Sequence, residues 1–229
     1  MALIVKKFGG SSVGSTEKIM NVAKRIIEEK KPGDQIVMVV SAMGDTTDDL
    51  IELAKGINSN PYQYSREMDM LLTTGEQVSI SLLTMAFKSL GQKAISLTGP
   101  MVGMRTNSVH TKGKIVDIKP SRVRKELEKG KIVVVAGFQG ADEKGDPVTL
   151  GRGGSDYSAA LYAAAVGADS LQIWTDVPGI MTANPRQVSS AVTVPTMSYA
   201  SALSLAENGA KVLYAPTLGP AMSSGIAIE

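Results

Sequence analysis

Short apolar runs alternate along this chain with longer segments in which apolar residues recur at helical spacing. Residues Ile36 to Val40 are continuously apolar, as expected of a strand that is buried on both faces of a parallel sheet. The preceding segment repeats apolar residues from Ile19 to Ile27 at helical spacing, and Pro32 and Gly33 end that helix. The same patterns predict strands at residues 3–5, 93–97, 101–106, 131–138, 171–175 and 226–228, and helices at residues 47–55, 68–72, 78–90, 121–129, 157–166, 198–207 and 214–223.

The order of these segments predicts the fold class. Strand and helix alternate without a linker, a repeat or a change in composition, which is typical of a parallel sheet between two layers of helices. We therefore predict one three-layer α/β/α sandwich with a mainly parallel central sheet over residues 1–229. Two segments interrupt the alternation: residues 57–64 are predicted to form a loop, and Thr73-Thr74-Gly75-Glu76 is predicted to break a long helical stretch in two.

Composition narrows the class of protein. Apolar residues make up 43% and charged residues 20% of the 229 residues, as in ordinary globular domains. The net charge is +2, no Lys/Arg block occurs and aromatic residues are only 4%, so we predict no nucleic-acid partner. The absence of cysteine excludes disulfides, thiolate metal sites and thiol catalysis. Because the sequence has no signal peptide and no apolar run of membrane-spanning length, we expect no membrane association and a cytoplasmic location.

Two glycine-rich turns carry the candidate chemistry. Gly151-Arg152-Gly153-Gly154-Ser155-Asp156 precedes a helix, and Lys7-Phe8-Gly9-Gly10-Ser11-Ser12 follows the first strand. Glycines let backbone N–H groups approach an anion closely, and a helix start adds a positive dipole end. In parallel sheets ligands bind beyond the carboxyl ends of the strands, so we expect both turns at one edge of the sheet.

This pattern favours phosphoryl transfer, in which positioning and electrostatics dominate. The only histidine, His110, lies among polar residues and is interpreted as a surface loop residue rather than a catalytic base. The P-loop, the dinucleotide-binding glycine motif and the hydrolase nucleophile elbow are all missing. Taken singly, each feature also has a simpler explanation: Gly9-Gly10 as a tight turn, Glu76 as a helix cap, Asp176 as a turn residue, and Arg186 and Lys211 as surface charges.

Five motifs occurring together favour the functional interpretation. The chain resembles the catalytic domain of the aspartokinases, members of the amino acid kinase fold, over essentially all 229 residues. The resemblance rests on Lys7-Phe8-Gly9-Gly10-Ser11-Ser12-Val13, Ser41-Ala42-Met43-Gly44-Asp45-Thr46-Thr47-Asp48, Thr74-Gly75-Glu76, Gly151-Arg152-Gly153-Gly154-Ser155-Asp156 and Thr175-Asp176-Val177-Pro178-Gly179.

The resemblance implies that ATP, with Mg²⁺ held mostly on its phosphates, phosphorylates the β-carboxylate of L-aspartate. The product, 4-phospho-L-aspartate, opens lysine, threonine and methionine biosynthesis. A carboxylate of pKa about 3.9 is already ionised and needs no general base, so the difficulty is repulsion between two anions. One lysine about 5 Å away offsets roughly 3 kcal/mol of that repulsion at an effective dielectric constant of about 20. The resemblance further implies a homodimer, and C-terminal regulatory modules that we expect this chain to lack.

Site residues follow motif by motif from the same resemblance. It implies catalytic roles for Lys7 and Asp156, with Lys7 stabilising charge on the phosphoryl group and Asp156 organising the basic groups around it. ATP binding is implied for Lys7, Gly9, Gly10, Ser11, Thr175, Asp176, Met181, Arg186 and Lys211. Aspartate binding is implied for Ser12, Ser41, Thr47, Glu76, Arg152, Gly153, Gly154 and Ser155, and no metal ligand is predicted.

One departure and two alternatives accompany this interpretation. Met181 stands where many relatives carry tyrosine near the adenine, and we expect a modest effect on ATP affinity. A related kinase for acetylglutamate, glutamate or UMP is the alternative enzyme. Glu76, as the partner of a free α-ammonium group, and Arg152 favour aspartate, because acetylglutamate lacks that charge and UMP carries no α-amino group. The alternative from another class is a nucleotide-binding domain with little turnover.

Overall fold

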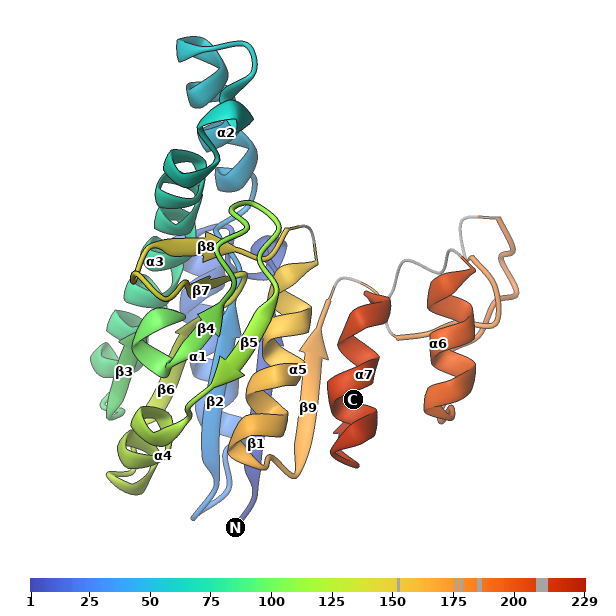
Figure 1. Ribbon diagram of the computed structural model, residues 1–229. Helices are drawn as coiled ribbons and strands as arrows, with labels where there is room; N and C mark the ends of the chain where they lie inside the picture. The colour runs from blue at the N-terminus through green and yellow to red at the C-terminus, as the bar shows by residue number, and fades with distance from the viewer. Residues whose placement is uncertain (152, 176, 178, 185–186, 209–213) are drawn as a thin grey trace.

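The computed structural model describes residues 1–151, 153–175, 177, 179–184, 187–208 and 214–229 of the chain. Its main sheet has six parallel strands in the order β10-β9-β1-β2-β6-β3 (Figure 1). They are β1 (Leu3–Phe8), β2 (Gln35–Val40), β3 (Ala94–Leu97), β6 (Ile132–Ala136), β9 (Ser170–Trp174) and β10 (Ala227–Ile228). All six were predicted, because strands with two covered faces are marked by short apolar runs.

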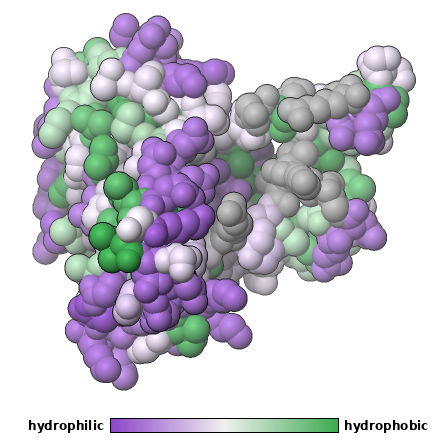
Figure 2. All heavy atoms as spheres, turned by 90° about the horizontal axis from the view of Figure 1, so that it is seen from above, coloured by the Kyte–Doolittle hydropathy of each residue, from purple (hydrophilic) through white to green (hydrophobic). Residues whose placement is uncertain are grey.

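Helices cover both faces of the main sheet and bury a separate apolar cluster on each. One face packs against α1 (Thr16–Glu29) and α3 (Ser65–Ser89). The other packs against α4 (Ser121–Glu128), α5 (Gly154–Val166) and α7 (Ala215–Ser223). This arrangement confirms the predicted three-layer sandwich. Helices α2 (Thr46–Ile57) and α6 (Tyr199–Glu207) lie beyond these layers, and in the view from above α6 belongs to a narrower arm beside the main body (Figures 1 and 2).

A second, four-stranded sheet lies next to the upper part of α3. Its order is β5-β4-β7-β8, with antiparallel pairs except between β4 and β7, which run parallel. The strands are β4 (Met104–Thr106), β5 (Ile115–Ile118), β7 (Gln139–Ala141) and β8 (Pro147–Thr149). Strand β8 packs directly on α3, so the loops of the small sheet reach the same end of the molecule as the carboxyl ends of the main strands (Figure 1).

Helix α3 corrects the sequence analysis, which predicted a break at residues 73–76. The helix is continuous from Ser65 to Ser89. The hydroxyl groups of Thr73 and Thr74 donate to the carbonyl oxygens of Met70 and Leu71, at 3.2 and 2.7 Å, so they are satisfied within the helix. Gly75 lowers helix propensity by about 1 kcal/mol relative to alanine, but tertiary packing of the helix overrides that preference. The predicted loop at residues 57–64 also contains a short 3₁₀ helix, Pro61–Tyr64.

The strand register brings the predicted functional turns to one edge. Phe8 is paired with both Val40 and Trp174, and Val40 is paired with Ala136. The residues that follow these four strand ends are Gly9, Ser41, Thr175 and Gly137. Among the helices that the structure describes, none has the length and apolarity to cross a membrane.

Candidate active site

An ion pair between Lys7 and Asp156 lies at the centre of this edge. Lys7 Nζ is 2.6 Å from Asp156 Oδ1, and the two side chains are only 12% and 19% exposed. Lys7 is on β1 and points toward α5, whose first turn contains Asp156. Side chains alternate across a strand, so the preceding Lys6 points to the opposite face, where its Nζ contacts Glu29 Oε2 at 2.8 Å. Strand geometry therefore distinguishes the site lysine from its neighbour.

The glycine-rich turn after β1 packs directly on the loop after β2. A Cβ atom on Gly10 would lie 2.7 Å from the carbonyl oxygen of Ala42, so any larger residue would push the two loops apart. The N–H of Gly44 also donates to the carbonyl oxygen of Gly10 at 3.0 Å. This contact places the turn predicted to hold phosphates beside the loop predicted to hold the acceptor.

Glu76 reaches the same loop from α3. Its side chain is buried, with the residue 3% exposed, and Oε1 accepts a hydrogen bond from the N–H of Ala42 at 3.1 Å. Oε2 has no hydrogen-bond partner among the described residues. Burial raises the pKa of Glu76 to about 7, because the ionised form loses hydration that one backbone donor does not replace. A cationic ligand group near Oε2 would satisfy this carboxylate.

These groups line one cavity of about 1400 Å³. Ten residues predicted for the site contribute to its wall: Lys7, Gly9, Gly10, Ser41, Thr47, Glu76, Gly153, Gly154, Ser155 and Asp156. Ser11 and Ser12 belong to the adjoining 3₁₀ helix, Gly10–Val13, but do not line the cavity. Both anion turns and the buried carboxylate thus meet at one place.

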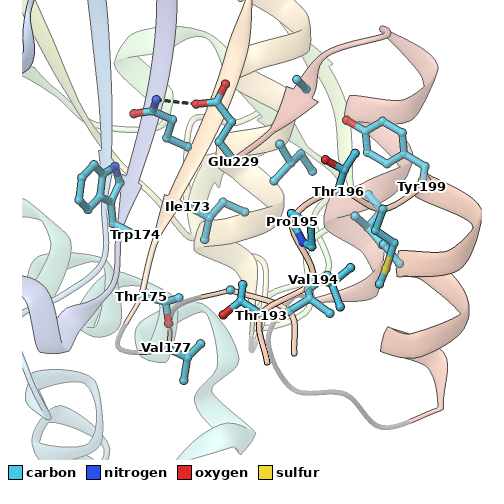
Figure 3. Close-up of a pocket in the computed structure, with 18 of the residues that line it drawn as sticks. Ile173, Trp174, Thr175, Val177, Thr193, Val194, Pro195, Thr196, Tyr199 and Glu229 are labelled. Carbon is cyan, nitrogen blue, oxygen red and sulfur yellow. Dashed lines mark hydrogen bonds between the residues drawn. The ribbon is translucent and has the colours of Figure 1, made fainter. Parts of the chain in front are cut away.

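A second cavity of about 980 Å³ lies at the end of β9 (Figure 3). Its lining is largely apolar, with Ile173 on β9 facing the segment Thr193–Thr196 in the close-up. Thr175, predicted to bind ATP, lines this cavity. Phe8 and Trp174 are paired and their rings stack at 5.3 Å, so Trp174, which lines the second cavity, lies beside the end of β1.

Met181 is the one remaining predicted ATP ligand that belongs to the described residues. Met181 does not line either cavity, but it forms an isolated β-bridge with Thr193, which lines the smaller one. The other predicted residues, Arg152, Asp176, Arg186 and Lys211, lie outside the described residues.

Several residues that line the larger cavity were not predicted from the sequence. Thr111, Lys112 and Lys114 reach it from the loop between β4 and β5, and Phe138 and Tyr214 line it as well. Phe138 has a positive φ of 67°, an unusual conformation for a bulky residue that often marks functional positions. No sequence motif pointed to these residues, because only tertiary packing brings them to the site.

His110 corrects a second prediction. It lies in a loop as expected, but its side chain is only 14% exposed, and Nδ1 is 2.9 Å from the fully buried Oδ2 of Asp69. The polar residues around His110 suggested solvent exposure, whereas α3 supplies a buried partner from 41 residues away.

Comparison with known proteins identifies the family of the chain. The chain belongs to the amino acid kinase family, whose model matches residues 2–229. It is 54% identical to the aspartokinase of Bacillus sp. (strain MGA3) over 229 residues, which is 100% of this chain and 55% of that protein. It is 55% identical to aspartokinase 2 of Bacillus subtilis (strain 168) over 214 residues, 93% of this chain and 52% of that protein. The chain thus spans about half the length of these relatives, and the resemblance inferred from the motifs is confirmed.

Solved structures give the same fold. Aspartate kinase from Synechocystis superposes with a TM-score of 0.87 at 46% identity, covering 100% of this chain and 37% of that one. Aspartokinase III from E. coli, in complex with aspartate and ADP, has a TM-score of 0.87 at 29% identity, covering 99% of this chain and 61% of that one.

Proposed function

We propose that this chain is the catalytic part of an ATP-dependent aspartate kinase, which transfers the γ-phosphoryl group to the β-carboxylate of L-aspartate. The observation that carries the proposal is the meeting of Lys7, Glu76 and the Gly153–Asp156 turn in one cavity. Similarity to aspartokinases over the whole chain supports it, as does the likeness to a solved aspartokinase that holds aspartate and ADP.

The larger cavity fits an amino-acid acceptor. Glu76 Oε2, the orphan oxygen that has no partner among the described residues, would accept hydrogen bonds from the α-ammonium group of aspartate. The N–H of Ala42 keeps Oε1 in place. The turn around Gly153 would hold the carboxylate end, and Ser41 and Thr47 would complete the wall. An acceptor without a free ammonium group would leave Glu76 unsatisfied, which disfavours acetylglutamate and UMP.

Lys7 would make the transfer possible by reducing repulsion. The acceptor carboxylate is ionised at neutral pH, so it attacks without a base, but it approaches a polyphosphate of like charge. A lysine side chain that is largely buried stabilises the charge on the transferring phosphoryl group more strongly than it would in water. Asp156, 2.6 Å away, would fix the direction of the ammonium group.

The nucleotide would lie along the same edge. We infer that its phosphates approach the Gly9-Gly10-Ser11 turn and that its base and ribose occupy the smaller, largely apolar cavity near Thr175. Asp176, Met181, Arg186 and Lys211 remain proposed contributors. No group of three or more potential acidic or histidine ligands is gathered among the described residues, so these residues do not build a metal site by themselves. We propose that Mg²⁺ is bound through the ATP phosphates.

The proposed reaction is the first step of lysine, threonine and methionine biosynthesis. We expect it in the cytoplasm, and we expect the parent enzyme to dimerise and to carry regulatory modules beyond the region that this chain matches.

Aspartate-dependent ADP release, with hydroxylamine trapping of the acyl phosphate as a hydroxamate, tests the proposal. Lys7→Ala should lower kcat/KM by about 10²- to 10³-fold, because it removes a charge that stabilises the transition state. Lys55→Ala is the matched control, since that lysine is on the surface of α2, where it pairs with Glu52. ADP release with glutamate or UMP but not aspartate would replace this proposal with a related kinase. Nucleotide binding without ADP release would support a domain that binds but does not turn over.

A further inference from the structure

Asp69 is a fully buried carboxylate that lies outside the predicted site. It is on α3, and its Oδ1 accepts a hydrogen bond from Thr149 Oγ1 of β8 at 2.5 Å. Oδ2 is 2.9 Å from His110 Nδ1 and accepts the N–H of Thr111 at 2.9 Å. Asp69 therefore ties the loop between β4 and β5 to both α3 and the small sheet.

The loop is held in a conformation that its sequence does not favour. Thr111 has a φ of 66°, in the left-handed region that β-branched residues rarely adopt. Such a conformation persists only where surrounding contacts impose it, and it often marks functional positions. The contact between the Thr111 N–H and Asp69 is the direct restraint on this residue.

Lys112 lies between two restrained residues. Thr111 on one side is bonded to Asp69, and the N–H of Gly113 on the other side donates to the carbonyl oxygen of Thr149 at 2.8 Å. At the base of the loop, Asn107 and Lys114 are joined by two hydrogen bonds of 2.9 Å. The backbone that carries the Lys112 side chain is thus fixed from both directions.

This restrained loop forms a wall of the larger cavity. Thr111, Lys112 and Lys114 line it, as do Gly151 and residues 153–156. A Cβ atom on Gly151 would lie 3.5 Å from the carbonyl oxygen of Thr111, which places the loop next to the turn proposed to hold the acceptor. Lys112 adds a cation at this wall, close to the turn at which the proposed function places a carboxylate of the acceptor.

We propose that Asp69 is a positioning residue that fixes the Thr111–Lys114 loop, and that Lys112 is a further acceptor-binding residue held by this loop against a carboxylate of the dicarboxylic amino acid. The inference rests on the proposed function for the identity of the acceptor. The restraint of the loop by Asp69 is independent of it.

Limited proteolysis tests the restraint without any activity. Trypsin cleaves after lysine, so cleavage at Lys112 and Lys114 reports how often the loop opens. We expect Asp69→Asn to increase the cleavage rate there about tenfold, because an amide group replaces one of the two acceptor oxygens. Glu67→Gln, on the exposed side of the same helix, should leave it unchanged. Equal rates in Asp69→Asn and the unaltered chain, with both folded by circular dichroism, would overturn the restraint.

Calorimetric titration with aspartate tests the acceptor-binding role. We expect Lys112→Ala and Asp69→Asn each to weaken aspartate binding about tenfold. The double variant should bind no more weakly than either single variant, because one change removes the Lys112 cation and the other releases the loop that positions it. Lys144→Ala, in the nearby turn between β7 and β8, is the control. Additive losses, or unchanged affinity in Lys112→Ala, would overturn the role of Lys112.

The same titration separates this inference from the proposed function. If the unaltered chain binds aspartate without releasing ADP, the proposed function fails while both parts of this inference stand. If the unaltered chain does not bind aspartate, the acceptor-binding role of Lys112 fails as well.

Discussion

Two buried carboxylates on one face of α3 differ in how completely they are satisfied. Asp69 and Glu76 are seven residues, or about 10 Å, apart along the helix. Asp69 contacts three donor groups from the small sheet and its loop. Glu76 accepts one backbone hydrogen bond at Oε1, and its Oε2 has no partner among the described residues.

The difference indicates a structural role for one carboxylate and a ligand-binding role for the other. Buried polar groups in native proteins are nearly always hydrogen-bonded, so a complete set of partners indicates a structural or positioning role. A buried oxygen without a partner costs folding free energy, and it is retained where a ligand supplies the missing contact. The pattern of satisfaction thus separates Asp69, which holds the wall of the cavity, from Glu76, which faces its contents.

The largest effect is expected when the half-satisfied carboxylate loses its charge. Glu76→Gln should lower kcat/KM for aspartate by about 10²- to 10³-fold, since the α-ammonium group would then be buried without its counter-ion. Steady-state ADP release at varied aspartate concentration measures this loss. The fall should come mainly from a higher KM for aspartate, with the KM for ATP little changed.

Glu67→Gln provides the matched control for that experiment. Glu67 is on the same helix, is exposed and pairs with Arg66 at the surface at 2.7 Å. Its replacement should change kcat/KM less than twofold, because surface ion pairs contribute about 1 kcal/mol or less. Comparable losses in the two variants would mean that charge on α3 in general, and not the orphan oxygen of Glu76, governs aspartate binding.

The fully satisfied carboxylate should instead matter most for stability. Asp69→Ala leaves the buried hydroxyl of Thr149 and the half-buried groups of His110 and Thr111 without their acceptor, and we expect the free energy of unfolding to fall by about 3 kcal/mol. Urea denaturation followed by circular dichroism measures the change. A loss below about 1 kcal/mol would contradict the assignment of Asp69 as a structural anchor.

The sequence was sufficient to predict the main sheet and, of the two carboxylates, the role proposed for Glu76. The apolar runs that become β2 and β6 have no polar alternation, so their burial between two helical layers could be predicted. Parallel strands end at one edge, which allowed the turns at Gly9 and Gly154 to be placed together before their contacts were known. Glu76 was proposed as an aspartate ligand by its resemblance to a family motif.

Asp69 and His110 could not be predicted, because their contact joins residues 41 positions apart through the packing of a small sheet. Local polarity around His110 suggested an exposed side chain, and tertiary contacts reversed that expectation. The break predicted at Gly75 failed for a related reason, since helix propensity is a weak preference that packing overrides.

Stability as a function of pH should separate the two carboxylates further. The pKa of Glu76 is raised from 4.5 to about 7 by burial, so the folded state holds a proton that the unfolded state has released. The contribution of Glu76 to the free energy of unfolding is therefore fully present below about pH 4.5 and is lost as the pH rises through about 7. The total loss is about 3 kcal/mol, at 1.36 kcal/mol per pKa unit. Glu76→Gln lacks this decline, so the variant should gain stability relative to the unaltered chain between pH 5 and pH 8.

Urea denaturation at pH 5 and pH 8, without ligand, measures this difference. Saturating aspartate should reduce it at pH 8, because the ammonium group stabilises the ionised carboxylate and ligand binding stabilises the folded state. A stability difference between the two proteins that is the same at both pH values would show that Glu76 ionises normally.

The smallest expected effect concerns the glycine beside Glu76. A Cβ atom on Gly75 would lie 2.9 Å from the Cβ of Ala42, the residue whose N–H holds Glu76 Oε1. Gly75→Ala should therefore push α3 from this loop and lower kcat/KM for aspartate about tenfold, while stability changes little because the gain in helix propensity, about 1 kcal/mol, offsets the clash. Gly56→Ala in α2 is the matched control, since nothing lies within 4 Å of its added Cβ. It should gain up to about 1 kcal/mol of stability with unchanged kinetics. If Gly75→Ala behaved like Gly56→Ala, the approach of α3 to Ala42 would not be what holds the half-satisfied carboxylate in its binding position.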